Sequence, residues 1–550
     1  MNLAIKLTGP AGKGINSTAH IIMSIFSKLG YYIISDTEYQ SLIKGGLNWF
    51  DIFVSDNKEN AISKKVDIVI SFDDKNLENV LKSLNKGGYI IINKKYSEKL
   101  KKNLNFSEYK LLELDIKDKY DNTYLLGILS KLLSLDESLV LSKIEEVFYS
   151  KGDLVLKYNK AIISNIYKSY ILSSDFDIKS IGKPKKIIYG NKALALGAIS
   201  SCLEYYSGYP MTPSSSLLSE IINSKKVTFL QAEDEISVIN SALGASFTGK
   251  RSMVGTSGGG FALMTEALSF SVQAEIPIVV VLSQRAGPST GTPTFHESAD
   301  LNFALNPTFG DFQHIVIQPS SLEEAYYYGG YSLNLADKYQ SIVILLMDKQ
   351  SSDMYSVVDN LKSANVDRGN ILDKAPENYK RYELTKDGIS PRVKVGTKYG
   401  DFIATSYEHD EYGATTEDTK IKQKMTEKRF RKLNNFFKTQ EEKGYEIINP
   451  EARKKFILTG FNSYVTKEFV RKNPEFGIII IKVLKPLNKE ILDQIKKLDE
   501  LIFIENNYSG QLENYITKEF GLKYLDNLKI SNIRKYDLYP FYIEDFDKFK

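Results

Sequence analysis

Four short runs of this sequence contain residue types that could do chemistry. Thr212 lies in Tyr-Pro-Met-Thr-Pro-Ser-Ser, Glu233 in Gln-Ala-Glu-Asp-Glu, and Arg285 in Gln-Arg-Ala-Gly-Pro-Ser-Thr-Gly-Thr-Pro-Thr. A fourth run, Thr-Ser-Gly-Gly-Gly-Phe, begins at Thr256. A hydroxyl, a carboxylate, a guanidinium and an open backbone can together bind an anion and hydrogen-bond a ligand nitrogen. We expect the four runs to lie together around one ligand-binding site.

Each run also has a purely structural interpretation. Ser and Thr ahead of an apolar stretch commonly cap a helix, and an acid such as Glu233 is favoured at a helix start by the helix dipole. The glycine run is compatible with a tight turn as well as with close approach of a ligand. Arg285 follows a very apolar stretch, 276–282, and therefore needs an anion, supplied either by the protein or by a substrate.

Short β-branched or aromatic stretches precede these runs and should position them. They are predicted strands at 205–209, 227–230, 253–256 and 276–283, with a further one at 342–347. Most of them lead into a helical pattern, which is typical of an α/β sheet. Ligands collect at the carboxyl ends of strands in such sheets, where the four runs lie.

The rest of the chain predicts a multidomain α/β protein. The first segment, 1–175, opens with a strand, a glycine-rich turn and a helical stretch at 18–29, and a polar linker follows around 182–186. The central domain covers 187–365. A highly charged connecting segment covers 366–450, and the βα pattern returns at 451–550.

Composition excludes several classes of protein. The chain has 550 residues, 42% hydrophobic and 25% charged, with a net charge of +4, so it resembles an ordinary globular protein without a nucleic-acid footprint. Its apolar runs are far shorter than the roughly 20 residues that cross a bilayer. The first residues lack a secretory signal pattern, which predicts a cytoplasmic protein. Its single cysteine, Cys202, cannot hold a metal cluster alone, and we expect it to be a small core residue.

At this point the motifs resemble a known family. The four runs in this order, with Tyr-Glu-His-Asp-Glu-Tyr-Gly from Tyr407 and Glu-Asn-Asn-Tyr-Ser-Gly-Gln-Leu from Glu505, resemble the alpha subunit of 2-oxoacid:ferredoxin oxidoreductases. The first 175 residues resemble the gamma subunit that is fused ahead of alpha in two-subunit members. The resemblance implies a gamma-like α/β domain, a pyrimidine-type doubly wound domain that binds thiamine diphosphate, and a C-terminal transketolase-like domain.

The resemblance also implies roles for individual residues. Glu233 is similar to the catalytic acid that hydrogen-bonds the aminopyrimidine of thiamine diphosphate. Arg285 and Thr212 match family positions that hold the substrate carboxylate, and Thr294 is a weaker candidate for the same pocket. Lys44 resembles a lysine that reaches the far end of the substrate, which would suit a dicarboxylate such as 2-oxoglutarate, although a solvated lysine in a turn is the alternative. The expected cofactor-binding residues, including the catalytic acid, are Tyr209, Pro210, Glu233, Ser257, Gly258 and Gly259.

The implied reaction is coenzyme A-dependent oxidative decarboxylation of a 2-oxoacid to its acyl-coenzyme A with reduction of ferredoxin. We find neither a Gly-Asp-Gly metal-diphosphate signature nor a set of cysteines. In the family, Mg²⁺ and a 4Fe-4S cluster belong to the beta subunit, so we expect an obligate partner chain. The segment Glu408–Glu411 lacks metal-ligand spacing and is interpreted as a structural loop, so no metal site is predicted in this chain.

Two alternatives remain open at this stage. The first is an enzyme of the same family that acts on pyruvate, a branched-chain or an aryl 2-oxoacid. The second is an inactive paralogue that serves as a scaffold, which the altered glycine turn from Gly9 to Gly14 leaves open. Thr212, Glu233 and Arg285 at the strand ends of one sheet argue against the scaffold.

Overall fold

The computed structural model describes residues 2–39, 48–58, 61–75, 77–101, 104–117, 120–172, 175–440, 442–525 and 527–549. The chain divides into two compact units. Unit 1 comprises Met1–Ile188, Met354–Asp359 and Tyr542–Lys550, and unit 2 comprises Tyr189–Asp353 and Asn360–Phe541. The domain boundaries expected from composition stay a prediction.

Unit 1 is built on an eight-stranded sheet in the order β6-β5-β4-β1-β3-β2-β14-β7. Strand β1 runs parallel to β4 and antiparallel to β3, so the sheet is mixed. The strands are β1 (Asn2–Gly9), β2 (Tyr32–Glu38), β3 (Asn48–Ser55), β4 (Val66–Ser71), β5 (Leu84–Asn93), β6 (Lys110–Leu114), β7 (Lys186–Tyr189) and β14 (Tyr355–Val358). The helices are α1 (Ile15–Lys28), α2 (Leu77–Leu81), α3 (Lys94–Leu100), α4 (Asp121–Leu132), α5 (Glu137–Phe148), η1 (Tyr149–Lys151), α6 (Asp153–Ser169) and η4 (Ile543–Phe549).

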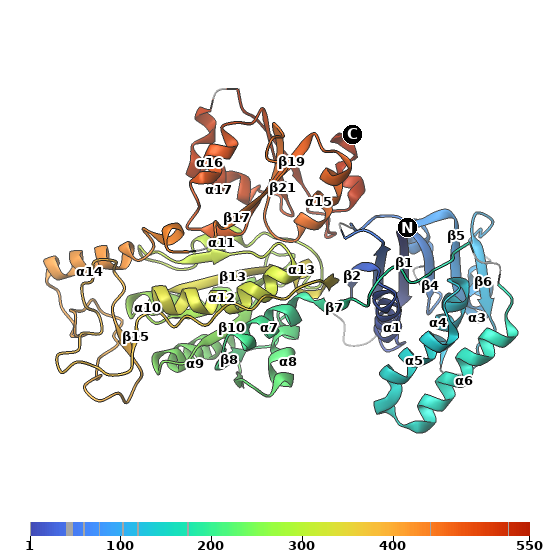
Figure 1. The fold of residues 1–550 in the computed structure, drawn as a ribbon, viewed down its shortest axis with the longest axis horizontal. Coiled ribbons are helices and arrows are strands. Elements are labelled where there is room, and N and C mark those ends of the chain that lie inside the picture. Colours follow the sequence, from blue (N-terminus) through green and yellow to red (C-terminus); the bar gives the residue numbers. More distant parts are fainter. Residues whose placement is uncertain are drawn as a thin grey trace. The chain divides into compact units, whose positions relative to one another are not determined.

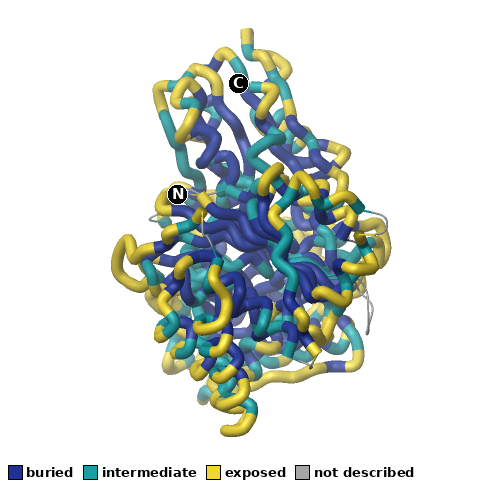
Figure 2. The backbone as a smooth tube through the Cα atoms, turned by 90° about the vertical axis from the view of Figure 1, so that its right-hand side faces the viewer, coloured by how far each residue is buried: buried dark blue, intermediate teal, exposed yellow. Residues whose placement is uncertain are grey.

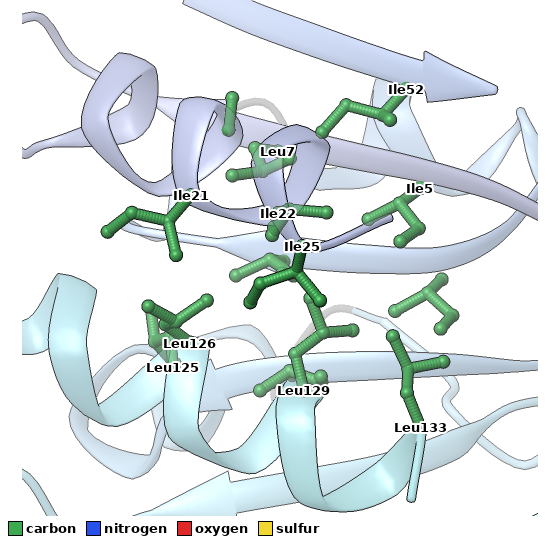
Figure 3. Packing of buried hydrophobic residues seen from close by; sticks show 14 of the residues in the cluster. Ile5, Leu7, Ile21, Ile22, Ile25, Ile52, Leu125, Leu126, Leu129 and Leu133 are labelled. Atoms are coloured by element: carbon green, nitrogen blue, oxygen red, sulfur yellow. The ribbon is translucent and has the colours of Figure 1, made fainter. Parts of the chain in front are cut away.

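The core of unit 1 lies between its sheet and its helices. Apolar residues spaced three and four apart give α1 one buried face, which includes Ile21, Ile22 and Ile25. Figure 3 shows this face packed between side chains of the sheet, such as Leu7, and leucines of α4, such as Leu129. Removing this apolar surface from water is the main stabilising contribution to such a core.

Unit 2 contains a seven-stranded sheet in the order β20-β12-β13-β11-β10-β8-β9, and its strands from β8 to β13 are parallel. The strands are β8 (Tyr205–Gly208), β9 (Thr228–Gln231), β10 (Ser252–Thr256), β11 (Ile278–Gln284), β12 (Ile315–Ile317), β13 (Ile342–Asp348) and β20 (Val483–Lys485). Its helices are α7 (Gly190–Ser200), α8 (Ser215–Ser224), α9 (Glu235–Phe247), α10 (Gly258–Gln273), α11 (Leu301–Leu305), α12 (Leu322–Tyr339) and α13 (Lys349–Asp353) (Figure 1). The central strands β10, β11 and β13 are buried almost throughout. Across the whole chain, buried segments lie inside and exposed segments lie mainly at the periphery (Figure 2).

A second, five-stranded sheet in unit 2 follows the charged connecting segment, with the order β17-β19-β18-β21-β22. Its strands are β17 (Tyr445–Ile448), β18 (Lys454–Leu458), β19 (Phe476–Ile481), β21 (Glu500–Glu505) and β22 (Lys529–Arg534), and its helices are α15 (Asn462–Lys472), α16 (Glu490–Ile495), α17 (Gln511–Phe520) and η3 (Leu522–Tyr524). The connecting segment contains β15 (Ile371–Leu372), β16 (Arg392–Val393), α14 (Thr419–Arg431) and η2 (Phe436–Lys438). The multidomain α/β class predicted from the sequence is therefore observed.

Candidate functional site

The four chemical runs begin at neighbouring strand ends of the seven-stranded sheet. Gly208 at the end of β8 is in register with Gly255 of β10 and with Gln231 at the end of β9. Thr256 at the end of β10 is in register with Leu282 of β11, two residues before Gln284. Because these strands are parallel, the residues that follow them emerge at the same edge of the sheet.

Two of the predicted substrate-binding residues are in direct contact. Nη1 of Arg285 donates a hydrogen bond of 2.7 Å to the backbone carbonyl oxygen of Thr212. Burial lowers the pKa of Arg285, whereas the negative charges of Asp300 and Glu235 oppose this shift. A guanidinium has five N–H donors, so Arg285 keeps donors for an anion while one donor fixes its position.

Glu233, the predicted catalytic acid, contacts the first turn of α9. It is exposed, and its Oε1 accepts a 2.6 Å hydrogen bond from the hydroxyl of Ser237. This hydrogen bond is the main cause of the lowered pKa of Glu233. The carboxylate is therefore solvated and bonded to a residue in the first turn of the helix that follows it, α9.

Glu235, two residues further on, is a buried carboxylate. It is only 4% exposed, it is the first residue of α9, and its Oε1 has no hydrogen-bond partner. A buried unpaired carboxylate oxygen is energetically costly and is characteristic of a binding site. The sequence did contain a signal for it, because the buried residues Val238, Ile239 and Ala242 follow at spacings of three, four and seven, which places Glu235 on the inner face of α9.

The glycine run forms the first turn of α10 and packs closely against two carboxylates. A Cβ atom on Gly260 would collide with Oε1 of Glu235, and one on Gly258 would lie 2.9 Å from Oδ2 of Asp300. Around Gly259, by contrast, there is open space. The helix is preceded by Ser257, which is fully buried and whose hydroxyl has no hydrogen-bond partner. The turn thus offers backbone N–H groups and a free hydroxyl to a ligand.

Several predicted cofactor residues lie on an exposed surface. Tyr209 is 40% exposed, and Pro210 and Gly259 are exposed as well. Strand β9 is an edge strand whose four residues are all exposed. Large exposed apolar side chains occur on β9 and on the neighbouring α9 and α10, namely Phe229, Leu230, Ile236 and Leu263. These residues and Tyr209 are called the apolar rim below.

Thr294 and Lys44 are the remaining predicted substrate residues. Thr294 is 3% exposed in the loop that follows β11, and no hydrogen bond given for the described residues joins it to Arg285 or Thr212. Lys44 lies outside the described residues. Both roles stay predictions.

Asp300 is a residue of this site that the sequence did not reveal. It lies just before α11, where an acid is ordinarily interpreted as part of a helix start. Burial and the neighbouring Glu297 raise its pKa to about 6, and Arg285 partly offsets this shift. No local sequence pattern places Asp300 against Gly258, since these residues meet only in the folded structure.

Other expected features lie away from this site. Glu408 accepts hydrogen bonds from both terminal nitrogens of Arg429, at 3.0 and 2.8 Å, and His409 is buried against the ring of Tyr382. The segment that begins at Glu408 therefore contributes to packing of the connecting segment.

Cys202 is exposed and has a left-handed backbone conformation, so its predicted core position is wrong. Among the described residues, no helix combines the length and apolar character required to span a membrane.

Comparison with known proteins identifies the family of this chain. Residues 197–428 match the family model described as pyruvate flavodoxin/ferredoxin oxidoreductase, thiamine diphosphate-binding, and residues 4–169 match the model of pyruvate ferredoxin/flavodoxin oxidoreductase. A 2-oxoacid:ferredoxin oxidoreductase subunit alpha from Sulfolobus sp is 30% identical, and the alignment covers 93% of this chain and 91% of the relative. The 2-oxoglutarate synthase subunit KorA from Methanocaldococcus jannaschii is 32% identical over 56% of this chain and 86% of the relative.

A solved structure extends the likeness to nearly the whole chain. The 2-oxoglutarate:ferredoxin oxidoreductase from Magnetococcus marinus, determined with 2-oxoglutarate, coenzyme A and succinyl-CoA bound, superimposes with a TM-score of 0.87 at 28% identity and covers 99% of this chain and 98% of its own. The chain therefore belongs to the family of 2-oxoacid:ferredoxin oxidoreductase alpha subunits. The family expected from the motifs is confirmed.

Proposed function

We propose that this chain is the large subunit of an enzyme that oxidatively decarboxylates a 2-oxoacid, transfers the acyl group to coenzyme A and reduces ferredoxin. The observation that supports this most directly is the meeting of Arg285, Thr212 and Glu235 at one sheet edge. An anionic substrate requires a cation in a fixed position, and Arg285 is fixed by the carbonyl of Thr212. A protonatable cofactor requires an acid, and Glu235 is a buried acid with a free oxygen.

Thiamine diphosphate, when bound, supplies the carbon nucleophile and accommodates the electrons released on decarboxylation. The residues fit such a group, because Glu235 has an unpartnered oxygen and the turn at Gly259 is open. We assign to Glu235 the hydrogen bond to the aminopyrimidine that the sequence assigned to Glu233. Ser257 would offer its free hydroxyl to the same ligand.

Arg285 would bind the substrate carboxylate. Its Nη1 is occupied by Thr212, which leaves the other donors of the guanidinium for the two carboxylate oxygens. Fixing the carboxylate orients the adjacent 2-oxo carbon, and correct orientation is a major part of catalysis. The backbone carbonyl of Thr212, and not its hydroxyl, makes this contact, so we assign Thr212 the role of holding Arg285.

A second chain would complete the site. The predicted cofactor residues lie on an exposed surface next to the apolar rim, and exposed apolar patches commonly mark protein interfaces. We propose that a beta subunit covers this rim and supplies the Mg²⁺-diphosphate site and a 4Fe-4S cluster. The lone Cys202 is consistent with a cluster located on another chain.

We propose 2-oxoglutarate as the substrate. The solved relative was determined with 2-oxoglutarate bound, and three KorA relatives are named 2-oxoglutarate synthase subunits. The predicted role of Lys44 at the far end of a dicarboxylate agrees with this choice. Pyruvate or a branched-chain 2-oxoacid would be the substrate of a related enzyme with the same chemistry.

The test is to purify the chain with its native partner under anaerobic conditions and to follow viologen reduction with coenzyme A and a panel of 2-oxoacids. We expect 2-oxoglutarate to give the highest kcat/KM, and Arg285→Ala and Glu235→Ala to abolish activity. Arg453→Ala is the matched control, because Arg453 is exposed and pairs only at the surface with Asp499. A complex that is inactive with every 2-oxoacid would support the scaffold alternative.

A further inference from the structure

The loop from Arg285 to Asp300 connects strand β11 to helix α11 and is called the β11–α11 loop below. Its first residue is the one that we assign to the substrate carboxylate. The two ends of the loop are joined, because the backbone N–H of Asp300 donates a 2.9 Å hydrogen bond to Oε1 of Gln284, the last residue of β11. Gln284 is buried and directly precedes Arg285 in the chain. The end of the loop is therefore coupled to the backbone that carries the arginine.

Two side-chain amides from the C-terminal part of unit 2 hold the end of this loop. Nδ2 of Asn507 donates to the carbonyl oxygen of Ser298 at 3.1 Å, and Nε2 of Gln511 donates to that of Ala299 at 2.7 Å. Oε1 of Gln511 accepts from the backbone N–H of Asn302 at 2.9 Å. Asn507 and Gln511, called the amide clamp below, thus hold the chain on both sides of the last loop residue. Helices α11 and α17 lie side by side at these contacts (Figure 1).

A buried carboxylate holds the amide clamp in place. Oε2 of Glu505, at the end of β21, accepts hydrogen bonds from Nδ2 of Asn507 at 3.0 Å and from the backbone N–H of Leu512 at 2.7 Å. Its Oε1 accepts from the backbone N–H of Glu513 at 3.0 Å. Glu505 therefore orients Asn507 and also fixes the first turn of α17, which begins at Gln511. A group that is fixed by its own hydrogen bonds positions its partners more accurately.

We propose that the amide clamp positions Arg285 for the substrate carboxylate. The clamp fixes the end of the β11–α11 loop, the hydrogen bond between Asp300 and Gln284 passes this constraint to β11, and the chain passes it to Arg285. The guanidinium itself is held by the carbonyl of Thr212, so its position depends on both its backbone and this contact. The inference rests on the proposed function of Arg285. Both clamp residues are positioning residues, since they act through the loop.

The position of Arg285 matters because of the geometry of its proposed ligand. A carboxylate that accepts two parallel hydrogen bonds from a guanidinium requires a defined orientation of that group. A displacement of about 1 Å at such a contact can lower the rate by about a hundredfold. Loss of the clamp should therefore weaken binding of the 2-oxoacid and not of coenzyme A, because the displaced group contacts only the 2-oxoacid. A role confined to packing predicts instead a lower melting temperature with no preference between the two substrates.

The experiment compares the assembled, partner-containing native enzyme with its Gln511→Met variant. Methionine keeps the length of the glutamine side chain and removes both of its hydrogen bonds to the chain around the loop end. We expect KM for the best 2-oxoacid to rise about tenfold, KM for coenzyme A to stay within about twofold and kcat to fall by less than about threefold. Asn514→Ala is the matched control and should keep native constants, because Asn514 is exposed on the same helix and its side chain donates to the carbonyl of Ser509.

A double-mutant cycle tests the route through β11. Gln284→Ala removes the acceptor of the Asp300 N–H and should raise KM for the 2-oxoacid by a similar factor. The double variant with Gln511→Met should be no worse than the larger single effect, since residues in one contact route do not act additively. Thermal melting checks that each variant is folded, and Gln284→Ala tests the same link if Gln511→Met does not fold.

Hydrogen exchange provides a readout that needs no substrate. In the native complex we expect slow exchange of the Asp300 amide, which bonds to Gln284. In Gln511→Met this amide should exchange at least about tenfold faster, because the clamp no longer holds the residues beside it. Mass spectrometry of peptides that cover residues 286–302 measures the change.

The outcomes separate the clamp from the proposed function. A Gln511→Met enzyme with a native KM for the 2-oxoacid, or with an equal rise in both KM values, overturns the positioning role. Additive effects in the double variant overturn the route through Gln284, and unchanged hydrogen exchange overturns the clamp itself. A native complex that oxidises no 2-oxoacid refutes the proposed function, and hydrogen exchange then still decides whether the clamp holds the loop.

Discussion

Arg285 combines a fixed position with spare hydrogen-bonding capacity. One guanidinium nitrogen donates a hydrogen bond to the carbonyl of Thr212. The negative charges of Asp300 and Glu235 favour the protonated form of the guanidinium. A lysine at the same position would retain the positive charge but not the planar fork that can bond a carbonyl and a carboxylate together. The residue type, and not only its charge, is therefore important here.

Arg285→Lys should raise KM for the 2-oxoacid by about tenfold or more, because the loss of one charge-assisted hydrogen bond costs about 1.5–3 kcal/mol. We expect kcat to fall less than kcat/KM. Steady-state kinetics of the assembled enzyme measures both quantities. Arg453→Lys, at an exposed position, should leave them unchanged. A native KM in Arg285→Lys would contradict the assignment.

Glu235 and Glu233 provide a comparison of two acids within one run. Glu235→Gln should reduce kcat by about 100-fold or more, the range usual for a lost acid-base group. Glu233→Gln should stay within about threefold, since Glu233 is solvated and bonded to Ser237. Equal losses in the two variants, or a loss confined to Glu233→Gln, would restore the assignment made from the sequence.

At the scale of elements, the first turn of α10 depends on glycine at one position in particular. Gly260→Ala should destabilise the chain by about 1–3 kcal/mol, because the new methyl group collides with Glu235 and Thr256. Gly244→Ala is the matched control, since Gly244 lies within α9 with open space around it and alanine is the better helix former. Chemical denaturation of both variants measures the difference, and a Gly260→Ala chain as stable as native would contradict the packing described.

Ion pairs within the connecting segment have a strength that depends on pH. Burial alone would raise the pKa of Glu408, but hydrogen bonds from Arg429 and Lys422 lower it to about 2. Because the folded-state pKa lies below the ordinary value of 4.5, Glu408 stabilises the fold above pH 4.5, and this stabilisation is lost as the pH falls toward 2. We expect Glu408→Gln to be less stable than native at pH 7 and to approach it as the pH falls toward 2, as measured by urea denaturation. A constant difference across this pH range would contradict the expectation.

The strands that precede the four runs could be predicted because each is a short β-branched or aromatic stretch that becomes a buried or edge strand. The assignment of the catalytic acid to Glu233 stays a prediction. Our proposal of Glu235 instead depends on the rotation of α9, which the positions of Val238, Ile239 and Ala242 reveal. Asp300 could not have been found in this way. Its loop is held by Asn507 and Gln511, about two hundred residues away along the chain, and such contacts leave no local pattern.

For the whole molecule, the apolar rim implies dependence on a second chain. Ile236→Glu should weaken the complex with the co-purifying partner while leaving the melting temperature of the isolated chain nearly unchanged, because Ile236 is 50% exposed. Leu154→Glu, at an 84% exposed apolar position in unit 1, is the control and should leave the complex intact. Size-exclusion chromatography measures assembly, and a complex that tolerates Ile236→Glu but not Leu154→Glu would locate the interface elsewhere.

Strand β14 makes unit 1 discontinuous along the chain. Unit 1 is assembled from three stretches of the chain, because residues 354–359 return to it from the middle of unit 2 and residues 542–550 return to it from the end. A coding sequence cut after residue 188 would therefore yield a fragment whose strand β2 lacks its neighbour β14 and whose surface lacks the C-terminal segment that bonds to Ile62. Separating the two units into independent genes would require new sequence to cover the exposed edge of β2, since an unpaired edge strand promotes aggregation.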